Sequence, residues 1–375
     1  MDVTKISREM LESGGSGTIG GYLPSIVDFG GIDGGPGVDN TAAFEALAAY
    51  CGANRCPGFI PAAVNGFATQ GDHVFNHGLV GVGGWASTII HTHASNTLIR
   101  TTNQSPGLFH GINYKSSVVR TAGATIAIDA PTGTLAYTPT ISGNIFEGGW
   151  IDINLVRANA ARIVNNTSFD WRRHFIQITN VDFPDNGDHH ICGNVFDTSM
   201  SATAGAGIMQ YNAGGCRIIS NKAGRGTHAY ELNLTGTPPD STSILLIEGN
   251  SFENQSIGQI RLRRAPGATA SFLHVVINGN QFAGSPAGNS SIQLDDSQEF
   301  ISNVLFTNNI VQFQTAGVTV TSAKSVMIAH NVFQSFGGGV GVQSGGTATG
   351  RIGHNVFNNV ATPVANSAAG MVVTG

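Results

Sequence analysis

Short runs of alternating apolar and polar residues recur along most of the chain, a pattern that predicts β-strands rather than helices. In several copies the run leads into an asparagine followed two residues later by phenylalanine, as at residues 246–252, 276–282 and 351–357. The asparagines form a column with a spacing of 22 to 30 residues: Asn144, Asn166, Asn194, Asn221, Asn250, Asn280, Asn309, Asn331 and Asn355. A repeat of this length indicates a solenoid in which each copy is one coil of short strands.

The residues at the turns have a structural interpretation. Asparagine tolerates left-handed backbone angles and can hydrogen-bond to the asparagine of the next coil, while phenylalanine fills the interior. His330 and His354 directly precede two of the asparagines and are interpreted as stacked turn residues rather than metal ligands. We expect about ten coils, from roughly residue 80 to the C-terminus, in a single elongated domain.

A second strand is expected after each turn, at residues 208–212, 230–234, 259–263, 292–295, 318–321 and 340–343. Because side chains alternate along a strand, Ile260 and Leu262 should point inward while Arg261 and Arg263 point outward. The pattern therefore predicts one long polar outer face.

Composition agrees with stacked coils and limits the partners. Glycine contributes 51 of the 375 residues and charged residues only 11%, which suits tight turns better than amphipathic helices. A formal net charge of -5 provides no basic stripe for nucleic acid and repels anionic membrane surfaces, so neither partner is expected. The four scattered cysteines match no disulfide framework or zinc site. The sequence leaves open whether Cys51 and Cys56 form a disulfide in an oxidising medium.

The N-terminal segment differs from the repeats. Charges are spread through its first residues and no apolar run follows, so neither a secretory signal peptide nor a transmembrane span is expected. Residues 2–13 have an amphipathic helical pattern, and the Gly- and Ser-rich residues 14–21 form a linker. The chain then divides into an arm and linker (1–24), an N-terminal cap with the first coils (25–90) and a parallel β-helix (91–375).

A short helix is expected before the repeats. Asp39 or Asn40 can cap it, and Phe44 and Leu47 would share one face. Such a helix would close the open end of a solenoid, which otherwise exposes core and unpaired strand edges.

The order of motifs between residues 26 and 90 resembles the opening of the pectate-lyase-like superfamily. IVDFGGIDGGPGVDNTAAFEAL at 26–47 is similar to the family's xDFGAxGDGxxDDTxAxxxA box, and GFIP at 58–61, GLVGVG at 78–83 and STII at 87–90 follow as its next strands. Two departures are the extra glycines at 34–37 and residues 62–65, where the family usually turns on glycine. The resemblance implies an all-β fold, a right-handed single-stranded parallel β-helix with a short N-terminal capping helix.

That fold is shared by lyases, hydrolases, epimerases and phage tailspikes. A short N-terminal arm joined to it resembles the attachment or trimerisation arm of bacteriophage tailspike depolymerases, and an unstructured tail is the alternative. The resemblance implies a homotrimer in a virion tail or in an extracellular location. It would cleave a bacterial capsule or lipopolysaccharide O-antigen, and residues 1–24 would bind a phage baseplate or tail protein.

Glu231 and Asp295 are the first choice for catalysis. Glu231 should align with Arg261 one coil further on, and Asp295 should lie two coils away, beyond Arg263. Two coils separate the backbones by roughly 10 Å, and leaning side chains could reach the spacing of an inverting glycosidase. The alternative is a ladder of salt bridges on a solvated face. Arg261, Arg263 and Gln293 would bind substrate on this face.

A second choice is the set Glu147, Asp170 and Asp197, which each follow a phenylalanine on successive coils. Carboxylates stacked at about 5 Å repel, which raises the pKa of at least one and suits the spacing of a retaining glycosidase. Solvated surface acids are the alternative here.

A third region is an acidic loop with two histidines. Asp182, Asp185 and Asp188 are a weak Ca²⁺ candidate that does not match the EF-hand spacing. His189 and His190 are expected to touch substrate from this loop. Trp150 offers a flat platform for a sugar ring.

The sequence leaves three functions open. A glycoside hydrolase needs only paired carboxylates and no cofactor. A polysaccharide lyase would act on a uronate polymer by β-elimination, with Arg261 or Arg263 as the base and Ca²⁺ as cofactor. A non-catalytic spike would bind carbohydrate without cleaving it.

Overall fold

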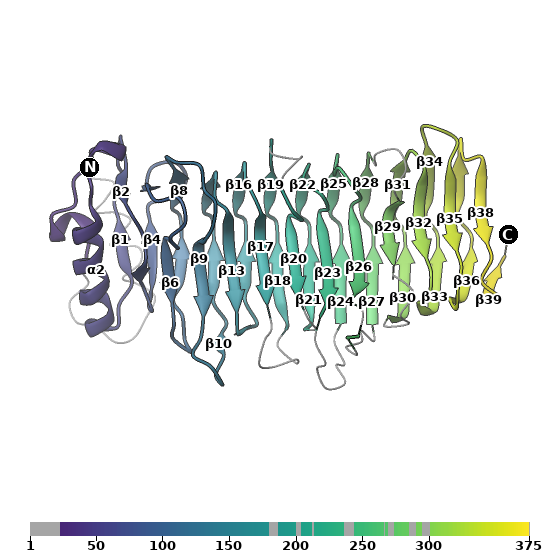
Figure 1. Ribbon diagram of the computed structural model, residues 1–375, viewed down its shortest axis with the longest axis horizontal. Coiled ribbons are helices and arrows are strands. Elements are labelled where there is room, and N and C mark those ends of the chain that lie inside the picture. The colour runs from purple at the N-terminus through teal and green to yellow at the C-terminus, as the bar shows by residue number, and fades with distance from the viewer. Residues whose placement is uncertain are drawn as a thin grey trace.

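The computed structural model describes residues 23–179, 187–199, 204–211, 214–235, 244–265, 267–268, 274–284, 290–294 and 301–374. Within these residues the chain winds into one elongated solenoid (Figure 1), and each strand pairs in parallel with the strand one coil away. This confirms the predicted right-handed parallel β-helix with an N-terminal capping helix. Twelve strands in each of two sheets show that the described chain has more coils than the repeat pattern indicated.

Three long sheets, here called A, B and C, follow one another in every coil. Sheet A contains β1 (Gly58–Ile60), β4 (Gly78–Gly81), β7 (Leu108–His110), β11 (Thr140–Ser142), β15 (Arg162–Val164), β18 (His189–Cys192), β21 (Cys216–Ile219), β24 (Ile244–Glu248), β27 (His274–Asn278), β30 (Ser302–Thr307), β33 (Lys324–Ala329), β36 (Thr349–Gly353) and β39 (Gly370–Val373).

Sheet B contains β2 (Phe67–Thr69), β5 (Thr88–His91), β8 (Asn113–Ser116), β12 (Ile145–Glu147), β16 (Thr167–Phe169), β19 (Val195–Asp197), β22 (Lys222–Gly224), β25 (Ser251–Glu253), β28 (Gln281–Ala283), β31 (Ile310–Phe313), β34 (Val332–Ser335) and β37 (Val356–Asn358).

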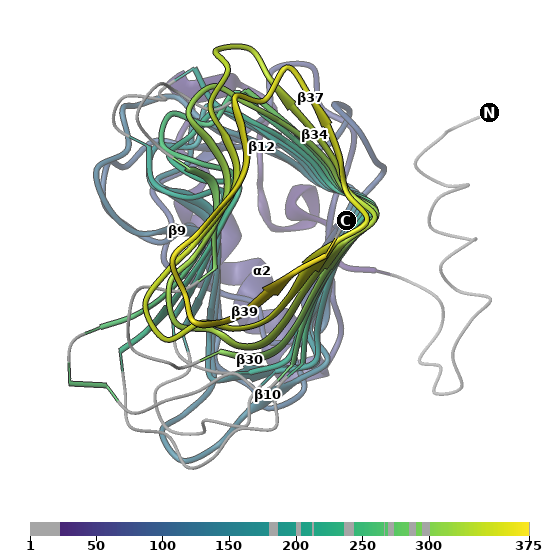
Figure 2. The same ribbon diagram turned by 90° about the vertical axis from the view of Figure 1, so that its right-hand side faces the viewer.

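Sheet C contains β3 (His73–Val74), β6 (Ile99–Thr101), β9 (Ala124–Asp129), β13 (Ile151–Val156), β17 (His174–Thr179), β20 (Ile208–Tyr211), β23 (Tyr230–Leu234), β26 (Ile260–Arg264), β29 (Ser290–Leu294), β32 (Ala316–Val320), β35 (Val340–Ser344) and β38 (Thr362–Asn366). A separate pair joins β10 (Ala136–Tyr137) to β14 (Ala158–Asn159). Viewed along the axis, sheets A and B meet at a sharp corner and sheet C closes the opposite side (Figure 2).

The predicted asparagine ladder runs along the corner between sheets A and B. Asn166 Oδ1 accepts hydrogen bonds from the backbone N of Asn144 at 3.0 Å and from its Nδ2 at 3.1 Å, and the pattern continues to Asn355. The expected left-handed conformation falls instead on the residue before each asparagine, for example Asn165. The ladder asparagine donates its backbone N–H to the asparagine of the next coil. The residue before it therefore adopts the left-handed conformation that turns the chain.

The turn residues and phenylalanines otherwise follow the prediction. His330 and His354 stack with ring centroids 5.6 Å apart and are both left-handed. Phe146, Phe196 and Phe252 are buried in the core. The turn histidines and the phenylalanine column are therefore structural, as expected.

The N-terminal end is closed by α2 (Thr41–Asn54), preceded by the short 3-10 turns η1 (Ile26–Phe29) and η2 (Gly35–Gly37) (Figure 1). Phe44 and Leu47 are fully buried. Asp39 Oδ1 accepts from the Thr41 backbone N at 3.0 Å, whereas the Asn40 side chain bonds to residue 32 instead. The predicted capping helix is therefore present, and the coils begin at β1 rather than near residue 80 because three-residue buried strands show no alternation.

The described residues show two further features. All four cysteines are free thiols, with Cys51 and Cys216 buried. No helix among the described residues is long and apolar enough to cross a membrane.

Candidate functional site

An open groove lies on the outer side of sheet B near the N-terminal end. Two adjoining cavities of about 370 and 310 Å³ form it, and both are lined by Lys115, Ser117 and Glu147. The larger cavity extends to Phe169 and Asp170 in the next coil. We call this surface the sheet B groove. Its combined volume is within the range of ligand-binding clefts in proteins.

Two carboxylates from neighbouring coils line the larger cavity. Glu147 ends β12 and pairs in register with Phe169 of β16, so Asp170 lies one coil on and one residue further along. Hydrogen bonds from Ser199, including its backbone N–H at 2.8 Å, lower the pKa of Asp170, and the nearby Arg225 lowers it further. Asp170 is therefore ionised at neutral pH.

A small polar cavity of about 10 Å³ lies behind Glu147. Glu147, Tyr114 and Arg120 line it, and the Glu147 Oε1 and Tyr114 hydroxyl atoms are buried without a hydrogen-bond partner in the described chain. Its size corresponds to about one water molecule. Glu147 thus has one oxygen toward a polar interior and belongs at the same time to the open groove.

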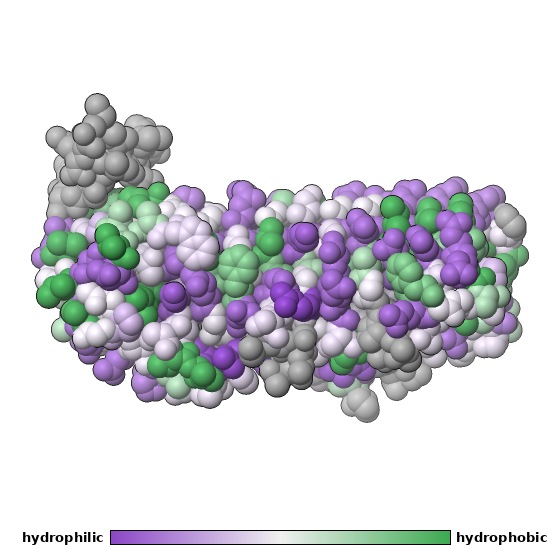
Figure 3. Space-filling model, turned by 90° about the horizontal axis from the view of Figure 1, so that it is seen from above, coloured by the Kyte–Doolittle hydropathy of each residue, from purple (hydrophilic) through white to green (hydrophobic). Residues whose placement is uncertain are grey.

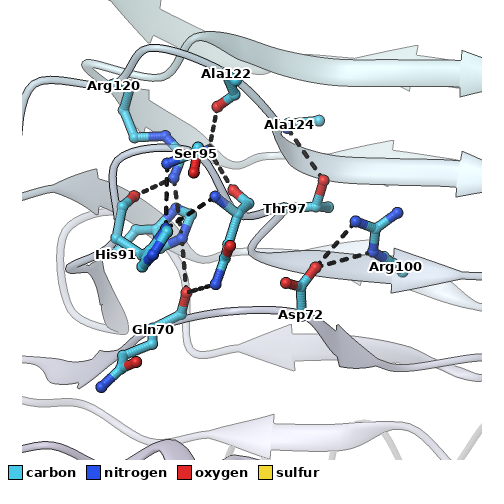
Figure 4. Close-up of polar contacts among 11 residues, drawn as sticks. Gln70, Asp72, His91, Ser95, Thr97, Arg100, Arg120, Ala122 and Ala124 are labelled. Atoms are coloured by element: carbon cyan, nitrogen blue, oxygen red, sulfur yellow. Dashed lines mark hydrogen bonds and ion pairs between the residues drawn. The ribbon is translucent and has the colours of Figure 1, made fainter.

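One wall of the groove is the loop of residues 117–123, which is fixed by a buried arginine. Arg120 is 1% exposed, and its guanidinium donates to the carbonyl of Ala122 at 2.8 Å and to those of Asn96 and His93 in the preceding coil (Figure 4). It also contacts His91 Nε2 at 3.0 Å. Burial lowers the pKa of His91 to about 3, helped by the Arg120 charge, so this ring is neutral. The wall is therefore held by charge-assisted hydrogen bonds to backbone.

The groove combines charged groups with flat apolar ones. Lys115 lies opposite Glu147 in the register of β8 and β12, and Arg172 lines the far end. Trp85 and Phe169 are both exposed and line the two cavities. Hydrophilic and hydrophobic side chains are intermixed on the side of the molecule that Figure 3 shows. Such a mixture suits a ligand with both hydroxyl groups and apolar faces, as carbohydrates have.

The second-choice acids are only partly stacked as expected. Asp197 pairs in register with Phe169, which places it two coils from Glu147, and Arg225 binds both of its oxygens at 2.8 and 2.5 Å. The expectation of three successive stacked carboxylates is wrong, because Ser168 rather than Phe169 occupies the phenylalanine column. Glu147 and Asp170 remain together in the groove.

The first-choice residue Glu231 lies on the outer side of sheet C. The predicted register is confirmed, with Glu231 opposite Arg261 and Arg261 opposite Gln293. Glu231 Oε1 is 2.9 Å from Arg263 Nε, and its Oε2 is 3.4 Å from His228 Nδ1. We call these five residues, 228, 231, 261, 263 and 293, the Glu231 cluster.

The Glu231 side chain is only 10% exposed. Burial raises the pKa of Glu231. The hydrogen bond and charge of His228 and the charges of Arg263 and Arg261 together lower it by more, so the pKa lies below its usual value. An ionised and enclosed carboxylate is unsuited to donate a proton to substrate. Its intended partner, Asp295, lies outside the described residues.

The remaining predicted site residues do not gather with either group. His189 is fully buried and its Nδ1 accepts from the Ala161 backbone N at 3.3 Å, so the expectation that it touches substrate is wrong. His190 pairs with Arg162 in sheet A, away from sheets B and C. Trp150 is half-buried in the turn after β12, and its indole is outside the sheet B groove.

The calcium prediction stays untested. Asp182 and Asp185 lie outside the described residues, and Asp188 alone is described. No three His, Cys, Asp or Glu side chains of the described chain come close enough to hold a metal ion. The N-terminal arm of residues 1–22 also lies outside the described residues.

Sequence reasoning missed several residues of the groove. Trp85, Asn113, Tyr114, Lys115 and Arg120 belong to no repeated column, and their roles depend on loops that bring them together. The tryptophan after a Gly-Gly pair, Trp85, was the one available signal, and it did not identify the groove because single exposed apolar residues are common on protein surfaces.

No protein-family model matches the chain, and no curated protein matches its sequence. Solved structures match over nearly the whole length. The A-module of Azotobacter vinelandii mannuronan C-5 epimerase AlgE6 is 12% identical with a TM-score of 0.57, covering 94% of this chain and 99% of that one. A GH87 α-1,3-glucanase catalytic domain in complex with nigerose is 12% identical with a TM-score of 0.63, covering 89% and 66%.

A third structure, the catalytic unit of a thermostable GH87 α-1,3-glucanase from Streptomyces thermodiastaticus, is 15% identical with a TM-score of 0.57 and covers 97% of this chain and 70% of that one. At such identities the likeness establishes the fold. The chain shares the right-handed parallel β-helix of these carbohydrate-active proteins.

Proposed function

We propose that the protein is a glycoside hydrolase that cleaves a polysaccharide lying in the sheet B groove. The observation that carries the proposal is that Glu147 and Asp170, from neighbouring coils, line one open cavity. Neighbouring coils are about 4.8 Å apart, which favours the close carboxylate spacing of retaining glycosidases.

The two carboxylates differ in a way that assigns their roles. Asp170 is held ionised by Ser199 and Arg225, so it is the nucleophile that attacks the anomeric carbon. Glu147 donates its proton to the glycosidic oxygen as the bond from carbon to that oxygen breaks. The glycosyl ester on Asp170 is then hydrolysed by a water molecule whose proton returns to Glu147.

The comparisons support a polysaccharide as substrate. The glucanase and epimerase structures are named for their action on an α-1,3-glucan and on mannuronan, and they share this fold. A bacterial surface polysaccharide, a phage tailspike origin, a homotrimer and a Ca²⁺ requirement remain predictions from the sequence.

The test incubates capsule and lipopolysaccharide panels, α-1,3-glucan and mannuronan with wild type, Glu147→Gln and Asp170→Asn. Mass spectrometry and ultraviolet absorbance then identify the products. Wild type should release saturated oligosaccharides, and each variant should be about 1000-fold slower, as expected for loss of an acid or a nucleophile. Asp72→Asn, an exposed carboxylate on another face, is the matched control that should keep full activity.

Three other outcomes would indicate a different function or a different catalytic site. Products with an unsaturated uronate would indicate a lyase, and binding without cleavage would indicate a carbohydrate-binding spike. Loss of activity in Glu231→Gln, with Glu147→Gln active, would move the catalytic site to sheet C.

A further inference from the structure

We infer that the N-terminal end of the sheet B groove is a binding subsite for a hexopyranose ring, centred on Trp85 and adjoining Glu147. The inference rests on the proposed function and deepens it: the enzyme would hold several consecutive sugar units and cut within long chains. It is drawn from the 310 Å³ cavity, which contains neither Asp170 nor Arg172.

The first observation is an aromatic ring left exposed in a concave surface. Trp85 is 60% exposed and lines the cavity together with Val64, which is 94% exposed, and Ile90. Exposed aromatic and aliphatic groups that gather in a cavity mark a binding site more often than scattered ones do. The flat indole face can stack on the apolar C–H face of a pyranose ring.

The second observation is a buried polar group in the same cavity. Asn113 is 3% exposed, yet its Oδ1 has no hydrogen-bond partner in the described chain, and the residue lines the cavity. A buried acceptor without a partner is costly, and a sugar hydroxyl that donates to it would remove the cost. The cavity therefore offers a stacking surface and an acceptor together, the two features that recognise a hexopyranose.

The third observation is that the cavity wall is fixed in place. Asp33 accepts hydrogen bonds from three successive backbone N–H groups, those of Val64 at 2.7 Å, Asn65 at 2.8 Å and Gly66 at 2.7 Å. A carboxylate bound in this way is a rigid clamp. The part of the wall formed by Val64 and Asn65 is thus in place before any ligand arrives, which lowers the entropy cost of binding.

The position of the subsite sets its relation to the cleavage point. Trp85 lies directly before β5, and β8 and then β12 with Glu147 follow as the next strands of sheet B. Two coil steps correspond to about 10 Å along the axis. One sugar unit is about as long as one coil step, so a ring stacked on Trp85 lies about two units from the bond that is cut.

The experiment uses Trp85→Ala in the full chain, with Phe336→Ala as the matched control because Phe336 is also 60% exposed but lies near the C-terminal end. The probes are nigerotetraose as a neutral tetrasaccharide and tetramannuronate as an acidic one. Isothermal titration calorimetry reports binding without any need for turnover, and it does not depend on the tryptophan that the variant removes.

At least one tetrasaccharide should bind wild type and Phe336→Ala with similar affinity. Trp85→Ala should bind roughly 10-fold more weakly, the value expected for loss of a stacked ring. Equal affinity of wild type and Trp85→Ala would overturn the subsite, and so would the absence of binding to both probes. If Glu147→Gln keeps full cleavage activity while Trp85→Ala loses binding, the proposed catalytic pair fails and the subsite stands.

Where a cleaved polymer is known, product length gives a second readout. Wild type should release mainly oligosaccharides of several units, and Trp85→Ala should shift toward a broader distribution with a higher KM and a similar kcat. An unchanged distribution and KM would contradict the subsite.

Discussion

The sheet B groove and the Glu231 cluster both display carboxylates on the outside of the same solenoid, yet their surroundings differ. Glu231 is enclosed and lies within ion-pair distance of His228 and Arg263. Glu147 and Asp170 line an open cavity. A carboxylate on the outer face of the solenoid is therefore not a catalytic candidate by its position alone.

The difference teaches how a repeated scaffold separates stability from chemistry. An ion pair with little solvent access is expensive to break, so the Glu231 cluster fixes the surface of sheet C. Carboxylates in an open groove can exchange solvent for substrate, and this is what a reaction needs. Stability measurements should therefore distinguish the two regions as clearly as activity measurements do.

The largest effect on stability is expected at the wall of the groove. Arg120→Met removes the guanidinium that binds the carbonyls of His93, Asn96 and Ala122, and leaves these part-buried groups without that donor. Hydrogen bonds to charged groups are worth about 1.5 to 3 kcal/mol each. The carbonyls are only part-buried and water can replace the donor, so the low end applies to the three bonds, and the loss should be roughly 4 kcal/mol. Urea unfolding followed by circular dichroism measures it.

Arg100→Met is the matched control for Arg120. Arg100 pairs with Asp72 at 3.0 Å on the surface, and the two side chains are 46% and 45% exposed (Figure 4). Exposed pairs contribute at most about 1 kcal/mol. If both arginine variants lost similar stability, the groove wall would not depend on the buried guanidinium. At temperatures where the Arg120→Met variant stays folded, it should also raise KM more than it lowers kcat, because Arg120 fixes the wall of the groove.

The fold was predictable from the sequence because the ladder needs the same residue in every coil. Asn144 and Asn166 bond to each other directly, so the spacing of asparagines reports the coils, and the register of Glu231 with Arg261 followed from it. Three coils break the phenylalanine column, where Ser168, Ala223 and Val311 stand in place of phenylalanine. At the first of them, Phe175 fills the core between Phe146 and Phe196.

The groove could not be predicted in the same way. It depends on the loop walls at residues 62–66 and 117–123, which do not repeat. A buried charge such as Arg120 also looks like a surface residue in the sequence, because its partners are backbone carbonyls. The sequence ranked the enclosed Glu231 before Glu147 and Asp170 because charge and spacing carry no information about burial.

An intermediate loss of unfolding free energy is expected when the Glu231 cluster is disrupted. Glu231→Gln leaves Arg263 and His228 without their carboxylate and should cost about 2 to 3 kcal/mol at pH 7. The folded-state pKa of Glu231 lies below its ordinary value of 4.5, so its contribution is present above pH 4.5 and is lost as pH falls through the lower folded value. The difference in unfolding free energy between wild type and variant should therefore shrink as pH falls below 4.5, and a constant difference would show that charge is not the cause.

The smallest effect on stability is expected at Asp152, a fully buried acid on the coil that carries Glu147. Its pH dependence is opposite to that of Glu231, because its contribution to stability falls as pH rises. Burial raises its pKa to about 7 from 3.8, while Ser168, whose hydroxyl donates to it at 2.5 Å, and Arg120 limit the rise. The native state therefore binds a proton that the unfolded state has lost, and wild-type stability should fall as pH rises from about 4 to 7.

Asp152→Asn keeps the shape and the bond to Ser168 but removes the titration. At pH 8 the variant should be more stable than wild type by about 1 to 3 kcal/mol, because wild type must bury an ionised carboxylate there. At pH 4 the two should be nearly equal. Asp72→Asn, on the surface, should show no such gain. If Asp152→Asn were less stable at both pH values, the ionised carboxylate would be a partner of Arg120 that supports the groove wall rather than a cost of the fold.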